Sequence, residues 1–161
     1  MPRFKTFYKA VNNMANPKTL KKIHDYFSLF PDGWIHEFTG DADCLKLKID
    51  CEYLGEVSNL KYSFFYVELV QIHRLDLSLW AKPSDLQPVL LTEIEDIFAK
   101  GLGIVTSRLQ SDCVELVCTQ EFRSEGHISL ACEYISVFDQ RMQEVTVNQL
   151  RKICGKYGAD F

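Results

Sequence analysis

Histidines, acidic residues and a tryptophan are concentrated in the fifteen residues His24–Phe38, which read HDYFSLFPDGWIHEF. A histidine beside carboxylates is the combination used for acid–base catalysis and for metal binding. His36, however, lies two positions from Trp34 and from Phe38, so on a regular strand these three side chains share one face. If the aromatic residues face the core, His36 is a partly buried histidine hydrogen-bonded near a turn. We therefore assign no catalytic residue here.

The six cysteines lack the spacing of a zinc site. Zinc ligands usually come as Cys-x-x-Cys or as closely spaced histidines, whereas Cys44 and Cys51 are seven positions apart and Cys113 and Cys118 are five apart. On regular strands each pair would point to opposite faces. The chain also lacks the Gly-x-Ser-x-Gly motif and a glycine-rich loop that opens a helix. We expect no metal and no cofactor.

Acidic residues continue beyond this stretch into the turn Gly40–Asp43. A calcium loop is not indicated, because Leu45 and Leu47 stand where further oxygen ligands are needed. Carboxylates around an aromatic anchor are instead typical of a surface that binds a basic protein. The residues predicted for such a partner-binding surface are Asp25, Asp32, Trp34, Glu37, Asp41 and Asp43.

A second function stays open beside this one. The chain could be a small-ligand-binding protein or a hydrolase-type enzyme, with a pocket between sheet and helices that uses His36, His73 and the nearby acidic residues. A concave site holding several titratable groups with shifted pKa values would favour that alternative. The dispersed pattern of polar residues favours the non-enzymatic interaction module.

Composition narrows the class of protein. The 161 residues fit a single α+β domain spanning 1–161, and 47% of them are hydrophobic. A net charge of −4 argues against nucleic-acid binding, which needs a concentrated basic surface. The sequence has neither the apolar run of a signal peptide nor about twenty consecutive apolar residues. We expect a cytoplasmic protein that does not bind membranes.

Two periodicities predict the elements. Apolar residues at helical spacing predict helices over Phe4–Met14 and over Leu20–Phe30, the second capped by Asn16-Pro17 and ended by Pro31-Asp32-Gly33. Thr146 and Gln149 form a capping box before a closing helix. Alternating residues predict strands over Trp34–Phe38, Leu45–Ile49, Ser63–Trp80 with a bulge near His73, Ile104–Leu109, Cys113–Phe122 and Gly126–Phe138.

These elements predict an α+β fold. We expect a mainly antiparallel β-sheet of about six to eight strands, with N-terminal and C-terminal helices packed on one face. Pro88–Lys100 suits either a helix or a strand, and its apolar spacing favours a helix. An exposed strand edge could also pair two copies into a homodimer.

The run Phe27–Ile35, followed by Leu45–Ile49, resembles the opening of small bacterial immunity proteins of polymorphic toxin systems and of related uncharacterised domains. In those, a helix leads through an aromatic-His-Asp turn into a β-meander. Pro31 stands where that pattern has histidine, whereas Asp32 and Ile35 keep its other positions. The resemblance implies a small bacterial interaction domain that blocks a toxin by binding it, and it transfers no catalytic residue.

Overall fold

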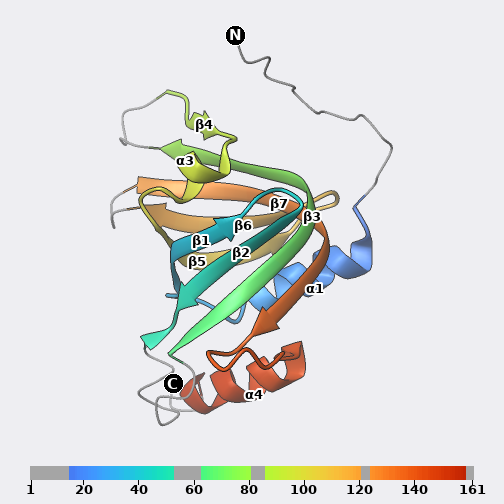
Figure 1. The fold of residues 1–161 in the computed structure, drawn as a ribbon. Coiled ribbons are helices and arrows are strands. Elements are labelled where there is room, and N and C mark those ends of the chain that lie inside the picture. Colours follow the sequence, from blue (N-terminus) through green and yellow to red (C-terminus); the bar gives the residue numbers. More distant parts are fainter. Residues whose placement is uncertain (1–14, 53–62, 81–85, 121–123, 159–161) are drawn as a thin grey trace.

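The computed structural model describes residues 15–52, 63–80, 86–120 and 124–158 (Figure 1). The predicted helix over Phe4–Met14 and the end of the predicted strand Cys113–Phe122 lie outside these ranges. Within the described residues, no helix has the length and apolar character needed to cross a membrane.

The two long helices begin where the capping residues predict. In α1 (Pro17–Phe27) the Asn16 side chain accepts a hydrogen bond from the Lys18 amide at 3.0 Å. Before α4 (Val147–Gly158) the Thr146 amide donates to the Gln149 side chain at 2.8 Å, and the Gln149 amide donates to the Thr146 hydroxyl at 3.2 Å. Both predicted caps are confirmed, because each satisfies amides that the first helical turn leaves without partners.

The described residues form one sheet of seven antiparallel strands: β1 (Trp34–Gly40), β2 (Cys44–Asp50), β3 (Phe64–Trp80), β4 (Val89–Leu91), β5 (Leu102–Leu109), β6 (Val114–Gln120) and β7 (Ser124–Phe138). Their order is β2-β1-β5-β6-β7-β3-β4, and β2 also pairs with β3. Six strands therefore close into a ring, and β4 extends it beside β3. The predicted α+β class and antiparallel sheet are confirmed.

The segment Pro88–Lys100 contains a strand and a helix, so predicting a helix alone is wrong for its first part. Leu91 pairs with Leu77 in β3, which makes β4 a short edge strand. The helix α3 (Ile94–Phe98) follows and buries Ile97 and Phe98. Leu90 lies at helical spacing from Ile94, so a helix pattern extends into the first part, but pairing with β3 makes that part a strand.

The long pairing of β3 with β7 changes its buried side halfway. Along β7 the buried residues include Ile128 and Leu130 in the first half, but Ile135 and Val137 in the second half. Because neighbouring strand residues point to opposite faces, the core moves from one face of the ladder to the other. A register shift between Ile72 and Arg74 in β3 accompanies this change and confirms the predicted bulge near His73.

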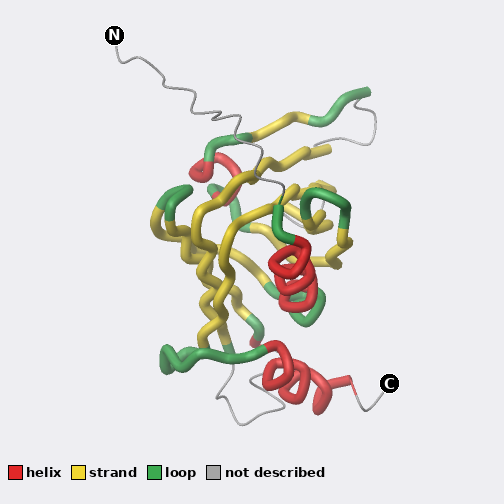
Figure 2. The backbone as a smooth tube through the Cα atoms, turned by 90° about the vertical axis from the view of Figure 1, so that its right-hand side faces the viewer, coloured by secondary structure: helices red, strands yellow, loops and turns green. Residues whose placement is uncertain are grey.

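Helix α1 covers the part of β7 that β6 does not reach, and it lies with α4 on one side of the sheet (Figure 2). Thr19 donates to the carbonyl of Glu133 at 3.2 Å, and the Lys22 ammonium donates to that of Ile135 at 3.1 Å. The apolar side of α1 is buried in the core, where its last residue, Phe27, meets Phe30 at 6.5 Å between ring centroids. The helix thereby covers carbonyl groups that an open strand edge would expose.

One phenol ties α1 to the chain segment before α4. Tyr26 is buried and donates to the carbonyl of Val145 at 2.8 Å. Burial, and secondly the Glu144 carboxylate, raise the pKa of Tyr26 above its ordinary value. The phenol therefore keeps the proton that it donates.

Alanine substitutions at two glycines, one in the β1–β2 turn and one in α4, should have opposite effects on stability. Gly40 has φ +102°, and a Cβ there would lie 2.0 Å from the Cys44 carbonyl oxygen, whereas a Cβ on Gly155 in α4 would meet nothing within 4 Å. We expect Gly40→Ala to lower the free energy of unfolding by more than about 2 kcal/mol. Gly155→Ala should leave it unchanged or raise it by up to about 1 kcal/mol. Urea denaturation of both variants measures this, and equal stabilities would contradict the turn geometry.

Candidate functional site

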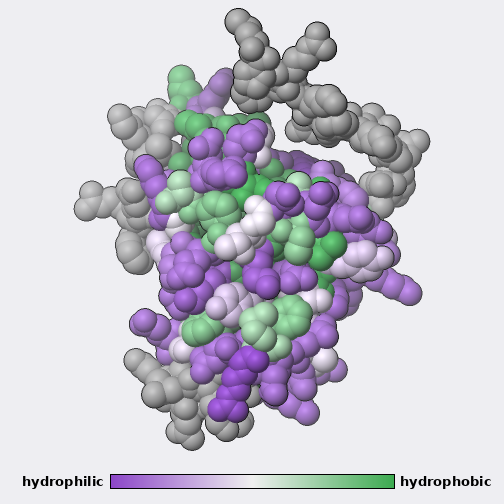
Figure 3. Space-filling view, in the orientation of Figure 1, coloured by the Kyte–Doolittle hydropathy of each residue, from purple (hydrophilic) through white to green (hydrophobic). Residues whose placement is uncertain are grey.

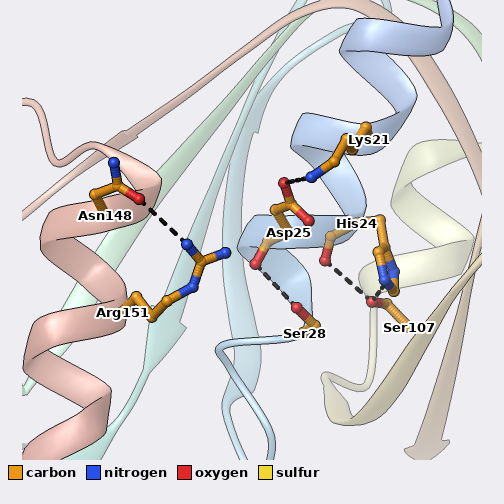
Figure 4. Close-up of polar contacts among 7 residues, drawn as sticks. All are labelled: Lys21, His24, Asp25, Ser28, Ser107, Asn148 and Arg151. Carbon is orange, nitrogen blue, oxygen red and sulfur yellow. Dashed lines mark hydrogen bonds and ion pairs between the residues drawn. The ribbon is translucent and has the colours of Figure 1, made fainter.

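The acidic residues predicted for partner binding are distributed over the molecule. Asp25 forms an ion pair with Lys21, one turn earlier in α1 (Figure 4). Glu37 in β1 forms one with Lys48 in β2 at 3.2 Å. Asp32 is exposed in the turn before β1, with φ 64°. The three carboxylates therefore lie on different elements, and two of them are paired with lysines.

Asp41 and Asp43 are brought together at the tip of the hairpin between β1 and β2. Both are exposed, and the Asp41 carboxylate accepts hydrogen bonds from the amides of Asp43 at 2.9 Å and Cys44 at 3.3 Å. This is the arrangement of an Asx turn, in which the side chain replaces a backbone acceptor. Asp41 thus shapes the tip, while Asp43 adds exposed negative charge beside it.

Trp34 packs inside the fold and contributes little open surface. It is half-buried, and a Cβ on Gly101 would lie 2.9 Å from the indole nitrogen Nε1. A Cβ on Gly103 would lie 3.0 Å from the same ring. The two glycines make room for the indole where β1 pairs with β5. The position of Trp34 is therefore explained by packing.

His36 and His73, predicted for the alternative pocket, are not brought together. His36 Nδ1 lies 3.2 Å from a carboxylate oxygen of Asp50, which pairs with Phe64 at the start of β3. His73 is exposed in the bulge, nine residues further along β3, on the order of 25 Å away. Two hollows of about 260 Å³ lie elsewhere, between α1 and β7 and beside α4, and neither histidine lines them.

His24 meets Ser107 instead, a contact that local sequence patterns do not reveal (Figure 4). The serine Oγ lies 2.8 Å from His24 Nδ1 and 3.2 Å from the carbonyl oxygen of His24. If Nδ1–H donates to Oγ, the hydroxyl donates to the carbonyl, and both groups are satisfied. Ser107 is only 6% exposed. The pair therefore fixes α1 on β5 and has the geometry of a structural contact.

His127 in β7 lies between two carboxylates, one on β6 and one on β7. His127 Nδ1 is 3.0 Å from Glu115 and Nε2 is 2.8 Å from Glu125, while Arg108 lies 3.6 Å from Glu115. The opposite sides of one imidazole ring cannot bind the same ion. In the described ranges, no group of three or more His, Cys, Asp or Glu side chains could hold a metal ion.

Aromatic side chains occupy the solvent-facing side of one half of the sheet. We call this surface the outer face and define it by alternate residues of β2, the first half of β3 and the last part of β7: Cys44, Lys46, Lys48, Asp50, Phe64, Tyr66, Glu68, Val70, Tyr134, Ser136 and Phe138. In Figure 3, hydrophobic and weakly polar surface alternates here with hydrophilic surface.

The aromatic residues of the outer face are held by contacts within β3 and between β3 and its neighbouring strands. The rings of Phe64 and Tyr66 meet edge to face at 5.5 Å, and the Lys48 ammonium lies 4.6 Å from the Phe64 ring. Tyr66 pairs with Phe138, and Tyr134 is 61% exposed. Pre-ordered aromatic rings among charged side chains are what protein interfaces use, because such rings bury much area at low entropic cost.

The sequence contains a pattern that indicates this face, although the prediction above relied on the acidic residues instead. In the run from Phe64 to Val70, the odd positions are buried, and the aromatic residues at even positions remain on the wet side. An antiparallel strand with one wet face normally places polar residues there. Phe64 and Tyr66 break that rule and could have been selected on this ground.

Comparison of the chain with protein-family models, with curated proteins and with solved structures gives no significant match.

Asp41 gives a prediction that separates shape from charge. We expect Asp41→Ala to lower the free energy of unfolding by about 1 kcal/mol, because two tip amides lose their acceptor. Asp41→Asn keeps a side-chain oxygen and should unfold like the unmodified chain. Thermal melts of both variants give the comparison, and equal loss in the two would mean that the charge itself stabilises the tip.

The cysteines should react in order of burial. Burial raises the pKa of Cys118 and of Cys132 to about 12 and that of Cys154 to about 11, whereas Cys44 is exposed on β2. We expect iodoacetamide at pH 8 to modify Cys44 first in the native protein. Peptide mass spectrometry over time measures the order, and Cys44→Ser should remove the fast phase. Early modification of Cys118 would contradict the packing.

Proposed function

We propose that the chain is a non-enzymatic protein-binding module that uses its outer face. The observation that carries the proposal is the row of partly exposed aromatic residues across β3 and β7, above all Tyr134. Binding energy at protein interfaces concentrates on tyrosine, tryptophan and arginine anchors surrounded by polar residues. The outer face offers such anchors and surrounds them with ion pairs, including Lys46–Glu68 at 3.7 Å.

The acidic hairpin tip supports a partner with a basic surface. Tyr134 pairs with Val70, and Val70 pairs with Cys44, the residue that follows the tip. The exposed carboxylates of Asp41 and Asp43 therefore lie at the same end of the outer face as the most exposed ring. Their charge would accelerate the encounter with a basic partner, and the ring would slow its dissociation.

The resemblance of Phe27–Ile35 to immunity proteins gives this proposal its specific form. A bacterial, cytoplasmic inhibitor that neutralises a toxin by stoichiometric binding needs a surface and no reaction centre. The separation of His36 from His73 weighs against the enzyme alternative, since catalysis requires both groups within reach of one substrate.

The test begins with purification of a partner on the immobilised chain, followed by binding kinetics with the purified partner. We expect Tyr134→Ala to raise the dissociation rate about tenfold or more, because an exposed anchor is lost while the fold is kept. Asp41→Asn combined with Asp43→Asn should mainly slow association at low salt, and added salt should remove the difference.

Thr106→Ala is the matched control, since Thr106 is exposed on β5, outside the outer face. The Tyr134, Asp41/Asp43 and Thr106 variants should melt within about 2 °C of the unmodified chain. Unchanged kinetics in Tyr134→Ala and in Phe64→Ala would overturn the outer face as the binding surface. Turnover of a co-purified small molecule would favour the enzyme alternative.

A further inference from the structure

Strand β4 ends the strand order of the sheet, and its outer edge meets no other strand of the described chain. In Figures 1 and 2 it lies at the periphery, beside the last part of β3. An edge strand presents backbone N–H and C=O groups that can pair with another strand. Its outer edge therefore has the chemistry needed to extend the sheet.

The side chains around this edge are apolar and exposed. Leu86 is 96% exposed, Val89 52% and Leu90 60%. The seven residues from Leu86 to Thr92 include no charged side chain. Natural edge strands are commonly protected by lysine, by inward-pointing charge or by a covering element, and the side chains of β4 give no such protection.

From these observations we infer that β4 pairs antiparallel with β4 of a second copy of this chain, around a two-fold axis through Leu90. A two-fold contact uses the same surface on both copies, so that surface must complement itself. An uncharged strand edge does so, because each copy supplies equivalent backbone donors and acceptors.

Charge selects the register of this pairing. Each chain carries a net charge of −4, so two copies repel one another, and this repulsion is weakest when the facing surfaces are uncharged. Pairing through Leu90 places Val89 opposite Leu91 and Thr92 opposite Pro88. The first acidic residue, Glu93, then lies opposite the neutral Gln87. No like charges oppose each other between Gln87 and Glu93 in this register.

The strand is short, so the dimer should be weak and dependent on concentration. Only Val89–Leu91 has strand geometry, and Pro88 has no N–H to donate. We expect sedimentation velocity to show monomer at about 1 µM and increasing dimer toward about 1 mM. Leu90→Lys should raise the dissociation constant at least about tenfold, because it places two ammonium groups face to face on the axis.

Val105→Lys is the matched control, since Val105 is a 48% exposed apolar residue on β5. It should leave the dimer unchanged. Thermal melts of both lysine variants verify that the fold is kept, because an exposed substitution costs little stability. A chain that stays monomeric over the whole range, or a dimer indifferent to Leu90→Lys, would overturn the inference.

Cross-linking tests the axis without relying on a disruptive charge. Residues directly opposite in an antiparallel pair have Cα atoms about 4.5–5.5 Å apart, within the range that a disulfide spans. We expect Leu90→Cys, made in a Cys44→Ser background, to form a covalent dimer under mild oxidation. Val105→Cys in the same background should not do so at the same concentration. Equal cross-linking of both would show random collision and overturn the register.

Discussion

The antiparallel ladder between β3 and β7 is the constraint on which the rest of the molecule depends. β3 is the strand that pairs with β2, with β7 and with β4, so it joins the ring to the added edge strand. Its bulge between Ile72 and Arg74 inserts one residue and lets both strands turn their apolar side chains inward in each half. Without that insertion, one half of β3 would present its apolar side chains to water.

The change of buried face decides which chemistry reaches the surface. In the first half of β3 the exposed side carries Phe64 and Tyr66, whereas past the bulge it carries Arg74, Asp76 and Ser78. Arg74 lies 3.2 Å from Asp76, so the second half is the ordinary wet side of a strand. The aromatic residues of the outer face are thus exposed by the same geometry that buries Phe65.

Local signals in the sequence predicted most elements of the fold. Alternation over Leu45–Ile49, the bulge near His73 and the caps at Asn16 and Thr146 depend on residues close together in the chain, and the structure contains all four. These features need no knowledge of distant partners. Strand order does need it, and so the closed ring and the split of Pro88–Lys100 could not be derived.

The candidate site could be predicted less well from the sequence, for the same reason. His24 meets Ser107 across 83 positions, and Tyr134 meets Val70 through pairing that no local pattern specifies. Acidic residues that are close in sequence, such as Asp25 and Asp32, are separated by a helix end and a tight turn. The contacts that build this surface therefore depend on strand pairing between distant parts of the chain, which local patterns do not specify.

The position of β3 also makes the two proposed contacts compatible. The outer face is built on the first half of β3 and β4 is attached to its last residues, beyond the bulge. Pairing of two copies through β4 therefore leaves both outer faces open, on separate parts of the dimer. A dimer with two open faces would bind a multivalent partner more tightly than one copy does, without any new contact, because the second binding event becomes intramolecular. A weak β4 contact is sufficient for this, since the partner itself would hold the two copies close together.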